Sequence, residues 1–227
     1  MLLSVIIPMF NEEPTIGDII DRTKATLQQV GLDYEIIVVD DCSWDRSVEI
    51  SRRRGAKVYS LKAHMGKGYA LRAGFAKAKG EIIATIDSDG SHRPEELPLL
   101  LTPVLQNQAD MVIGSRFSGP KPTSGKKFNL AGVRIFNFII KTFTGAEVSD
   151  SQSGYRVMKT AVLKDLSFKS GEYEIESEML VKIAKQGFRV TEVPISFDQR
   201  TYGRSRLDPI VDGFKIFLSI FTSYLTG

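Results

Sequence analysis

The fold is decided by one stretch of sequence, Ile82-Ile83-Ala84-Thr85-Ile86-Asp87-Ser88-Asp89. Its first five residues are apolar or β-branched and carry no charge, which predicts a short buried strand. Its last three residues place two carboxylates where that strand ends, and ligands bind at the carboxyl edge of open α/β sheets. Asp87 and Asp89 are two residues apart, so in an extended segment they point the same way and repel each other unless a cation lies between them. The pair predicts a divalent metal that bridges the protein to a phosphate-bearing substrate; the alternative is an Asp-rich turn that caps the next helix.

Strands and helices alternate on both sides of this stretch. The apolar patterns predict buried strands over residues 2–7, 34–39, 57–61, 82–86 and 110–114. Helical spacing or helix-start residues predict helices over 15–30, around 48–50, and over 66–80 and 94–106. Regular alternation of this kind indicates an α/β fold with a parallel, doubly wound sheet.

The composition limits the class of protein. With 227 residues, 42% of them hydrophobic, the chain suits one α/β domain. The net charge of +3 and the lack of a dense basic run do not favour a nucleic-acid partner. A single cysteine, Cys42, excludes an intramolecular disulfide and fits a reducing, cytoplasmic compartment. Residues 1–8 have no basic leader and are expected to form the first strand, and no apolar run reaches the length of a membrane span.

The second half of the chain combines basic loops with apolar helices. From Arg116 to Lys141 there are six Lys or Arg residues and no acid. Apolar residues recur at helical spacing over 133–143 and again over 210–225. Basic loops beside bulky apolar helices suit an anionic, lipid-rich surface, so we expect peripheral contact with the cytoplasmic face of a membrane. The alternative is that both helices pack on the sheet or on another subunit.

Carboxylates also follow the other strand ends, at residues 8–13 and 40–45. The phosphate-binding glycine patterns of common nucleotide folds are absent from the sequence, although Lys67 at a helix start is a candidate phosphate contact or else a surface lysine. Carboxylates select hard cations such as Mg²⁺ or Mn²⁺, and such a cation can hold a nucleotide diphosphate. Asp41 is then a candidate acceptor of hydrogen bonds from the base or ribose. Three arginines are candidates for fixed positive charge: Arg116, Arg200 and Arg206.

Eight short motifs occur in an order that resembles family 2 glycosyltransferases, and the dolichol-phosphate mannose synthase group in particular. They are Pro8-Met9-Phe10-Asn11-Glu12, Val39-Asp40-Asp41, Gly66-Lys67-Gly68, Asp87-Ser88-Asp89, Gly114-Ser115-Arg116, Ser153-Gly154-Tyr155-Arg156, Glu192-Val193-Pro194-Ile195 and Arg200-Thr201-Tyr202-Gly203-Arg204-Ser205-Arg206. The resemblance implies a GT-A fold, which is Rossmann-like with helices on both faces of a mostly parallel sheet. It implies a catalytic domain over 1–206, with a basic acceptor loop and apolar helix at 117–145, and a C-terminal apolar amphipathic helix at the membrane interface over 207–227.

The resemblance also implies ligands and roles. The donor is a nucleotide sugar, with GDP-mannose favoured over UDP-glucose or UDP-N-acetylglucosamine, and the acceptor is a polyprenyl or dolichyl phosphate; a separate membrane-anchoring subunit is a further candidate partner. The base and ribose pocket is formed by Pro8, Phe10, Glu12, Val39 and Asp41. Asp87, Ser88, Asp89 and Ser91 bind the diphosphate, with Asp87 and Asp89 as metal ligands. The expected catalytic set is Asp89, Arg116, Arg200 and Arg206, the arginines facing phosphates. Phe10, Ser91 and Arg206 depart from the tyrosine, glutamine and lysine found at these places in related enzymes.

The implied reaction is displacement at the anomeric carbon, with inversion, by an oxygen of the lipid phosphate. A phosphate monoester is already largely anionic at neutral pH, so this acceptor needs positioning and charge compensation more than a general base. The acids Asp150, Glu174, Glu176 and Glu178 are candidates for contacts with sugar hydroxyls or, alternatively, for complementing a helix dipole. Two rival functions remain: a phosphohydrolase of the haloacid-dehalogenase type, in which Asp87 is a nucleophile, and a catalytically silent membrane-docking module.

Overall fold

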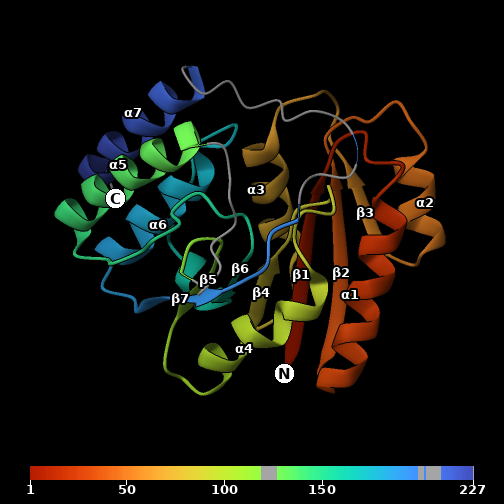
Figure 1. The fold of residues 1–227 in the computed structure, drawn as a ribbon. Helices are drawn as coiled ribbons and strands as arrows, with labels where there is room; N and C mark the ends of the chain where they lie inside the picture. Colours follow the sequence, from red (N-terminus) through yellow and green to blue (C-terminus); the bar gives the residue numbers. More distant parts are fainter. Residues whose placement is uncertain (119–126, 199–201, 203–210, 227) are drawn as a thin grey trace.

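The computed structural model describes residues 1–118, 127–198, 202 and 211–226, and in these ranges helices cover both faces of a seven-stranded sheet (Figure 1). The strands are β1 (Leu2–Met9), β2 (Asp33–Asp40), β3 (Lys57–Ser60), β4 (Ile82–Thr85), β5 (Met111–Ser115), β6 (Arg156–Lys159) and β7 (Val190–Pro194). The helices are α1 (Ile16–Val30), α2 (Ser47–Arg53), α3 (Lys67–Lys77), α4 (Leu97–Leu105), α5 (Lys127–Thr144), α6 (Ile175–Lys185) and α7 (Val211–Thr226), with short 3₁₀ turns at Pro94–Glu96 and Thr160–Leu163.

The sheet order is β3-β2-β1-β4-β6-β5-β7. The pairs β1–β2, β2–β3, β1–β4 and β5–β7 are parallel, whereas β6 runs antiparallel to both of its neighbours. The prediction of an α/β fold with a mostly parallel sheet is therefore confirmed. β6 was not predicted from the sequence, because its four residues, Arg-Val-Met-Lys, are too few to show the alternation of a strand.

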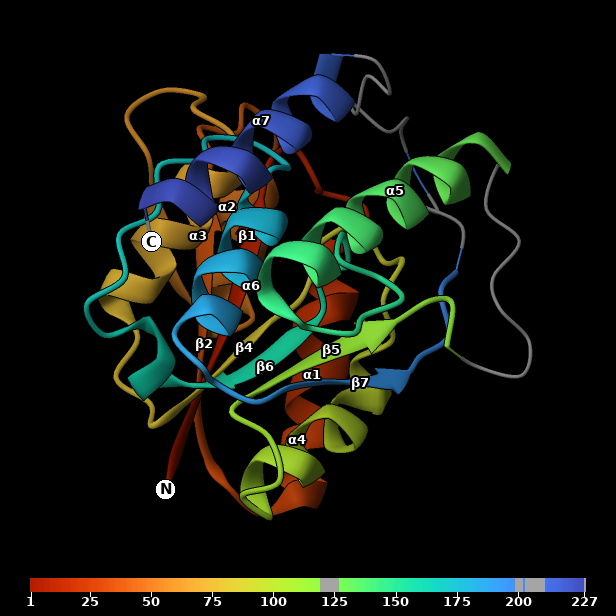
Figure 2. The same cartoon turned by 90° about the vertical axis from the view of Figure 1, so that its left-hand side faces the viewer.

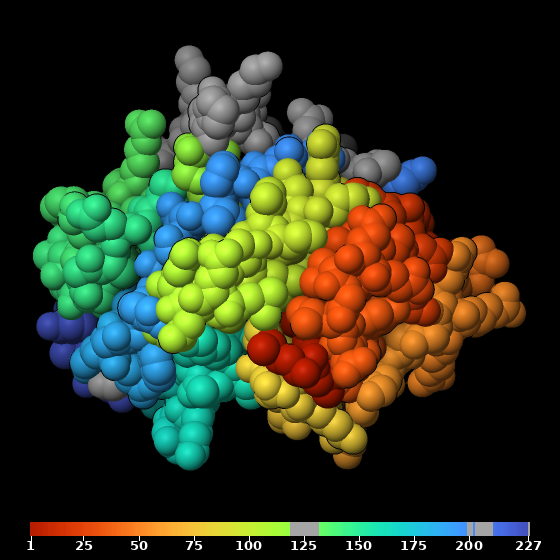
Figure 3. Space-filling view, turned by 90° about the horizontal axis from the view of Figure 1, so that it is seen from below, coloured from red at the N-terminus to blue at the C-terminus, as the bar shows by residue number. Residues whose placement is uncertain are grey.

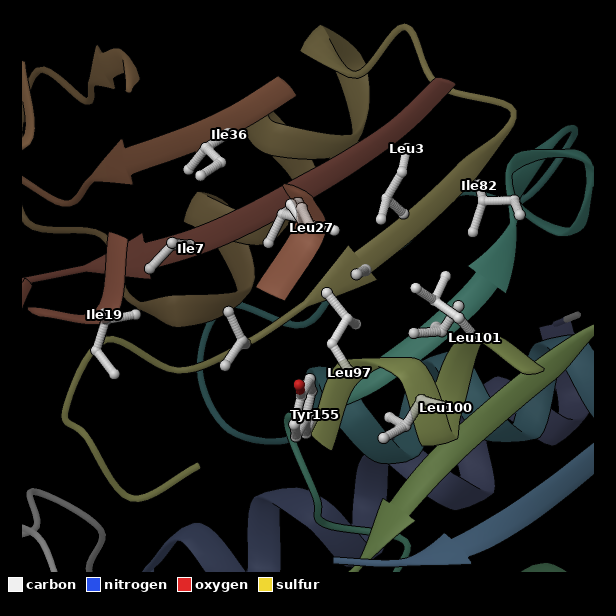
Figure 4. Close-up of a cluster of buried hydrophobic side chains, with 14 of the residues drawn as sticks. Leu3, Ile7, Ile19, Leu27, Ile36, Ile82, Leu97, Leu100, Leu101 and Tyr155 are labelled. Carbon is white, nitrogen blue, oxygen red and sulfur yellow. The ribbon is translucent and has the colours of Figure 1, made fainter. Parts of the chain in front are cut away.

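Each face of the sheet has its own apolar core. On one face, α1 and α4 pack on the strands through residues such as Leu27, Leu97 and Leu100, which meet Leu3 and Tyr155 (Figure 4). Seen from below, the side chains of α1 and α4 lie against each other (Figure 3). On the other face, α3 and α6 pack on the sheet, and α5 and α7 lie side by side over α6 (Figure 2). Two closed faces leave the edges of the sheet as the places where a ligand can reach the strand ends.

The strand register brings the acidic loops to one edge. Met9 pairs with Asp40 and Ile6 pairs with Thr85, so the loops after β1, β2 and β4 leave the sheet side by side. Thr85 also pairs with Arg156, the first residue of β6. Because β6 runs in the opposite direction, the loop that precedes it, residues 149–155, arrives at this same edge. The antiparallel strand thus adds a fourth loop to the carboxyl edge.

Several element boundaries differ from the sequence prediction. β1 continues through Pro8 to Met9, because its partners on β2 extend to Asp40. The helix predicted over 94–106 is a 3₁₀ turn followed by α4, which tolerates Pro98 in its first turn. The apolar helix predicted over 133–143 starts earlier, at Lys127. Within the described ranges, no helix combines the length and apolar character that crossing a bilayer requires.

Candidate active site

A cavity of about 720 Å³ opens at the carboxyl edge of the sheet. Sites for small molecules have volumes of roughly 300–1,000 Å³, so this one can hold a nucleotide sugar. Most of the site residues predicted from the sequence line it: Pro8, Phe10, Glu12, Asp41, Asp87, Ser88, Asp89, Ser91 and Arg116. The side chain of Val39 is instead buried in the core against α3. Arg200 and Arg206 lie outside the described residues.

One end of the cavity is aromatic. The ring of Phe10 stacks on the imidazole of His64, with centroids 3.9 Å apart and planes 7° from parallel. Trp44 meets the Phe10 ring edge-on at 5.1 Å and is largely exposed. These flat surfaces at the mouth of a polar cavity are suited to contact a nucleobase through its π face.

The carboxylate of Asp41 organises this aromatic end. Its Oδ1 accepts a hydrogen bond from the Met65 amide at 2.7 Å, and its Oδ2 accepts one from the Gly66 amide at 2.8 Å. The same Oδ2 lies 2.6 Å from Nδ1 of His64. Asp41 therefore holds the 64–66 loop and orients the imidazole; its predicted contact with a base or ribose stays a prediction.

Ser88 ties the loops after β1 and β4 together beneath the cavity. Its hydroxyl donates to the carbonyl of Pro8 at 2.8 Å, and its own carbonyl accepts from the hydroxyl of Thr15 at 2.7 Å. The Thr15 hydroxyl also lies 3.2 Å from Oε2 of Glu12, which is buried. These contacts hold the loops after β1 and β4 in register, so Asp87 and Asp89 are carried on a braced backbone.

The two acids of the deciding stretch have different neighbours. Oδ1 of Asp89 accepts from both the amide and the hydroxyl of Ser91, at 3.0 and 2.6 Å, in a turn that Gly90 completes with a φ of 78°. Oδ1 of Asp87 lies 2.6 Å from Nζ of Lys67. Burial alone would raise the pKa of Asp87, but the charge of Lys67 lowers it to about 2, so this carboxylate is ionised at neutral pH.

Arg116 reaches the cavity from the end of β5. Its guanidinium makes a two-point contact with the buried carboxylate of Asp150 and lies over the ring of Phe197, 5.1 Å from the centroid. Burial alone would lower the pKa of Arg116, but its hydrogen bonds to Asp150 keep it above the usual value. The cavity therefore holds a permanent, fixed positive charge near the two acids.

Comparison with known proteins identifies the family. The model of glycosyl transferase family 2 matches residues 4–167. The chain belongs to this family. A dolichol-phosphate mannosyltransferase of Pyrococcus furiosus is 31% identical over 91% of the chain and 59% of its own length. A UDP-N-acetylglucosamine–dolichyl-phosphate N-acetylglucosaminyltransferase of Methanococcus voltae is 32% identical over 95% of the chain and 93% of its own length.

Solved structures share the fold of this glycosyltransferase. Glucosyl-3-phosphoglycerate synthase of Mycobacterium tuberculosis, in complex with Mn²⁺, UDP and phosphoglyceric acid, superposes with a TM-score of 0.78 at 23% identity, covering 98% of this chain and 78% of that one. Mannosyl-3-phosphoglycerate synthase of Rubrobacter xylanophilus gives a TM-score of 0.75 at 22% identity, covering 99% and 73%. At such identities the likeness establishes the common fold and nothing finer. The family assignment also decides against the phosphohydrolase alternative.

The four acids considered for sugar contacts lie away from the cavity wall. Asp150 pairs with Arg116, as described above. Glu178 pairs with Lys182 at 2.7 Å and accepts amide hydrogen bonds from residues 169 and 170. Glu174 accepts from the amide of Gly171, and Glu176 pairs with Lys67. Within the described ranges, none of the four lines the cavity, which instead meets the neighbouring residues 172 and 173.

Some lining residues were missed by the sequence reasoning. They come from loops and from the first two turns of α7, and they are His64, Glu172, Tyr173, Phe197, Val211, Asp212 and Lys215. None lies at the end of a predicted strand, and the crossing of α7 over the cavity depends on tertiary packing. The only sequence signal was the position of His64 shortly before Gly66-Lys67-Gly68.

The residues present fit a hard divalent cation. Asp87 and Asp89 supply oxygen ligands to one cavity, and Mg²⁺ commonly takes only one or two carboxylates while substrate phosphates and water complete its shell. The described part of the chain contains no group of three or more His, Cys, Asp or Glu residues placed to hold a metal ion.

Proposed function

We propose that this family 2 glycosyltransferase transfers a hexose from a nucleotide sugar to the phosphate of a polyprenyl phosphate such as dolichyl phosphate. One observation carries the proposal: a carboxylate pair, two fixed cations and an aromatic wall share a single cavity at the carboxyl edge. The relatives from Pyrococcus and Methanococcus are named for sugar transfer to dolichyl phosphate, which supports this choice of acceptor.

The donor occupies the cavity in a defined direction. Its base lies at the aromatic end near Phe10 and His64, and its diphosphate lies near Asp87, Asp89 and Arg116. A Mg²⁺ or Mn²⁺ ion held by the two acids neutralises the diphosphate and so stabilises it as the leaving group. The Mn²⁺ and UDP in a solved structure of the same fold support this arrangement. The guanidinium of Arg116, fixed by Asp150, adds positive charge without having to reorient during the reaction.

The acceptor supplies its own nucleophile. The second pKa of a phosphate monoester is about 6, so an oxygen of the lipid phosphate is anionic at neutral pH and can displace the nucleoside diphosphate with inversion. The protein has to align the two phosphates and offset their charge rather than remove a proton. In this proposal Arg116, Arg200 and Arg206 contact phosphates of the donor or acceptor.

The base and the sugar are a finer proposal. We favour GDP-mannose, with UDP-glucose or UDP-N-acetylglucosamine as the alternatives. The relatives support both a mannose donor and an N-acetylglucosamine donor, since one is named for mannosyl transfer and another for N-acetylglucosaminyl transfer. A screen of labelled GDP-mannose, UDP-glucose and UDP-N-acetylglucosamine with a polyprenyl phosphate and Mg²⁺ or Mn²⁺ tests the proposal. Label in the lipid fraction supports it; hydrolysis of phosphomonoesters with no sugar transfer would overturn it.

We further propose that α5 and α7 contact the cytoplasmic face of a membrane, where the acceptor resides. Their exposed apolar side chains support this: Ile135, Phe138, Phe214, Phe217, Leu218, Phe221 and Leu225. The first turn of α7 also lines the cavity, so a lipid lying along the helix brings its phosphate near the acids. In this view 1–206 forms the catalytic domain, with the acceptor segment at 117–145, and 207–227 is the membrane-interface segment; an anchoring subunit can add to the contact.

Vesicle flotation tests the membrane contact. Phe214→Ser combined with Phe217→Ser removes exposed apolar area from α7 and is expected to reduce binding to anionic vesicles several-fold. Leu99→Ser is the matched control, because Leu99 is exposed on α4, on the other face of the sheet. Equal binding of both variants and the unmodified protein would contradict the assignment of this surface.

A further inference from the structure

Lys67 lies between two carboxylates at the start of α3. Its Nζ is 2.6 Å from Oδ1 of Asp87 and 2.7 Å from Oε1 of Glu176. Only 16% of the Lys67 side chain and 4% of the Glu176 side chain are exposed. Among the described residues, Lys67 is the one cation within ion-pair distance of Glu176. The ammonium is thus held from behind by a buried acid and presented to Asp87 in the cavity.

The backbone around Lys67 is shaped to keep it there. A Cβ on Gly154 would lie 2.7 Å from Nζ of Lys67 and 2.8 Å from both carboxylate oxygens of Asp87. A Cβ on Gly68 would lie 2.3 Å from the carbonyl oxygen of Ser170, and the Gly68 amide donates to the carbonyl of Gly171 at 2.8 Å. The backbone therefore packs directly on the ion pair, which leaves the lysine little freedom to turn away.

The ammonium of Lys67 already occupies one oxygen of the Asp87 carboxylate, since its Nζ lies 2.6 Å from Oδ1. A divalent cation that approaches Asp87 meets an ammonium already bound to the same carboxylate, and like charges at such distances repel each other. A diphosphate brings the negative charge that both cations need.

We infer that Lys67 is a positioning residue that couples binding of the divalent cation to binding of the donor. It holds the Asp87 carboxylate in place, makes the cation site weak when no diphosphate is present, and contacts the diphosphate when donor and cation bind together. This inference rests on the proposed function, since it takes the diphosphate of a nucleotide sugar as the ligand.

The test compares two binding measurements on the same variants. Lys67→Gln removes the ammonium, Lys67→Arg keeps the charge, and Lys62→Gln is the matched control at an exposed lysine five residues earlier. For Lys67→Gln, we expect Mn²⁺ alone to bind more tightly, and GDP or UDP with Mn²⁺ to bind more weakly, each by on the order of tenfold. Lys67→Arg should recover much of the nucleotide affinity, and Lys62→Gln should match the unmodified protein. Calorimetry measures the affinity for Mn²⁺. The fluorescence of Trp44, the single tryptophan, measures binding of the nucleotide.

The opposite shifts separate positioning from a structural role. A general loosening of the site weakens both ligands together, and that result would overturn the inference, as would unchanged affinities. Lys67→Gln leaves Glu176 buried and unpaired, and the variant can therefore fold poorly. In that case the double variant Lys67→Gln with Glu176→Gln removes the unpaired charge. The same results are expected of it: tighter binding of Mn²⁺ alone and weaker binding of the nucleotide with Mn²⁺. If the unmodified protein binds neither GDP nor UDP with Mn²⁺, the proposed function itself fails. If it binds them and Lys67→Gln behaves identically, only the coupling by Lys67 fails.

Discussion

Arg116 and Asp150 face each other across the edge of the cavity in a two-point contact. Nε of Arg116 lies 2.6 Å from Oδ2 of Asp150, and Nη2 lies 2.7 Å from Oδ1. Asp150 is completely buried, and its own amide donates to Oε1 of Glu192 at 2.8 Å. The contact joins the end of β5 to the loop before β6 and turns a flexible side chain into a fixed charge.

Removing the negative charge of this pair is expected to affect both stability and donor binding. Asp150→Asn keeps the shape but leaves Arg116 without its counter-ion, and breaking one side of a buried pair costs about 3–5 kcal/mol. We expect a lower free energy of unfolding in urea and weaker binding of nucleoside diphosphate with Mn²⁺. Asp165→Asn is the control, since Asp165 is exposed and Asn tolerates its left-handed backbone, with a φ of 67°. Equal losses in the two variants would refute the role of the pair.

The aromatic end of the cavity predicts a loss of base affinity. Phe10→Ala removes the ring that stacks on His64, and stacking of a base on an aromatic side chain contributes about 1–3 kcal/mol. Binding of GDP or UDP is therefore expected to weaken by a factor of roughly 5 to 150. Tyr59→Ala provides the comparison, because this half-exposed ring lies on β3 and does not line the cavity. Unchanged nucleotide affinity in Phe10→Ala would place the base elsewhere.

Two glycines predict opposite changes in stability. A Cβ at position 68 collides with the backbone carbonyl of Ser170, so Gly68→Ala is expected to lower the free energy of unfolding by roughly 1–3 kcal/mol. Gly132 lies inside α5, where an added Cβ meets nothing within 4 Å among the described residues apart from the helix's own backbone and chain neighbours, and Gly132→Ala is expected to raise stability by about 0.5–1 kcal/mol. Thermal melts of both variants check this; a stabilised Gly68→Ala protein would mean that α3 and residues 170–171 are not packed as described.

The low pKa of Asp87 predicts a pH dependence with a defined sign. Its folded-state pKa of about 2 lies below the ordinary value of 3.8, so the ionised carboxylate stabilises the fold above that ordinary value. This contribution, about 2 kcal/mol, is lost as the pH falls toward 2. The difference in free energy of unfolding between the unmodified protein and Asp87→Asn is expected to stay constant from about pH 5 to 8 and to shrink below about pH 4. A difference that does not change with pH would contradict the ion pair with Lys67.

Much of the fold could be predicted from the sequence, because the local patterns of apolar residues agree with the structure as a whole. The apolar strands before Asp40 and Asp87 and the alternation with helices predict a mostly parallel sheet, and the register of β1, β2 and β4 confirms that their loops meet. The position of the site at the carboxyl edge follows from the same parallel order. The short strand β6 was not readable, because four residues carry no period and its antiparallel direction depends on partners far away in sequence.

The partners of individual charges were the harder part. Asp41 is predicted from the sequence to accept hydrogen bonds from the ligand, and the sequence does not reveal that its oxygens also hold the amides of Met65 and Gly66. Glu176 does lie in the first turn of α6, as its place in a helix-start acidic cluster indicates, but the sequence does not reveal that its side chain also pairs with Lys67. Such pairings join residues about 25 to 110 positions apart in the sequence, and a pattern read along the chain does not reveal which acid meets which base.

The most direct test of the central claim follows both products of the reaction at once. The protein is incubated with a nucleotide sugar labelled in the sugar, polyprenyl phosphate and Mn²⁺, beside the Asp89→Asn variant. Equal amounts of lipid-linked label and released nucleoside diphosphate are expected with the unmodified protein, and neither product with Asp89→Asn. Label released as free sugar with none in the lipid fraction, or full transfer by Asp89→Asn, would contradict the proposed function.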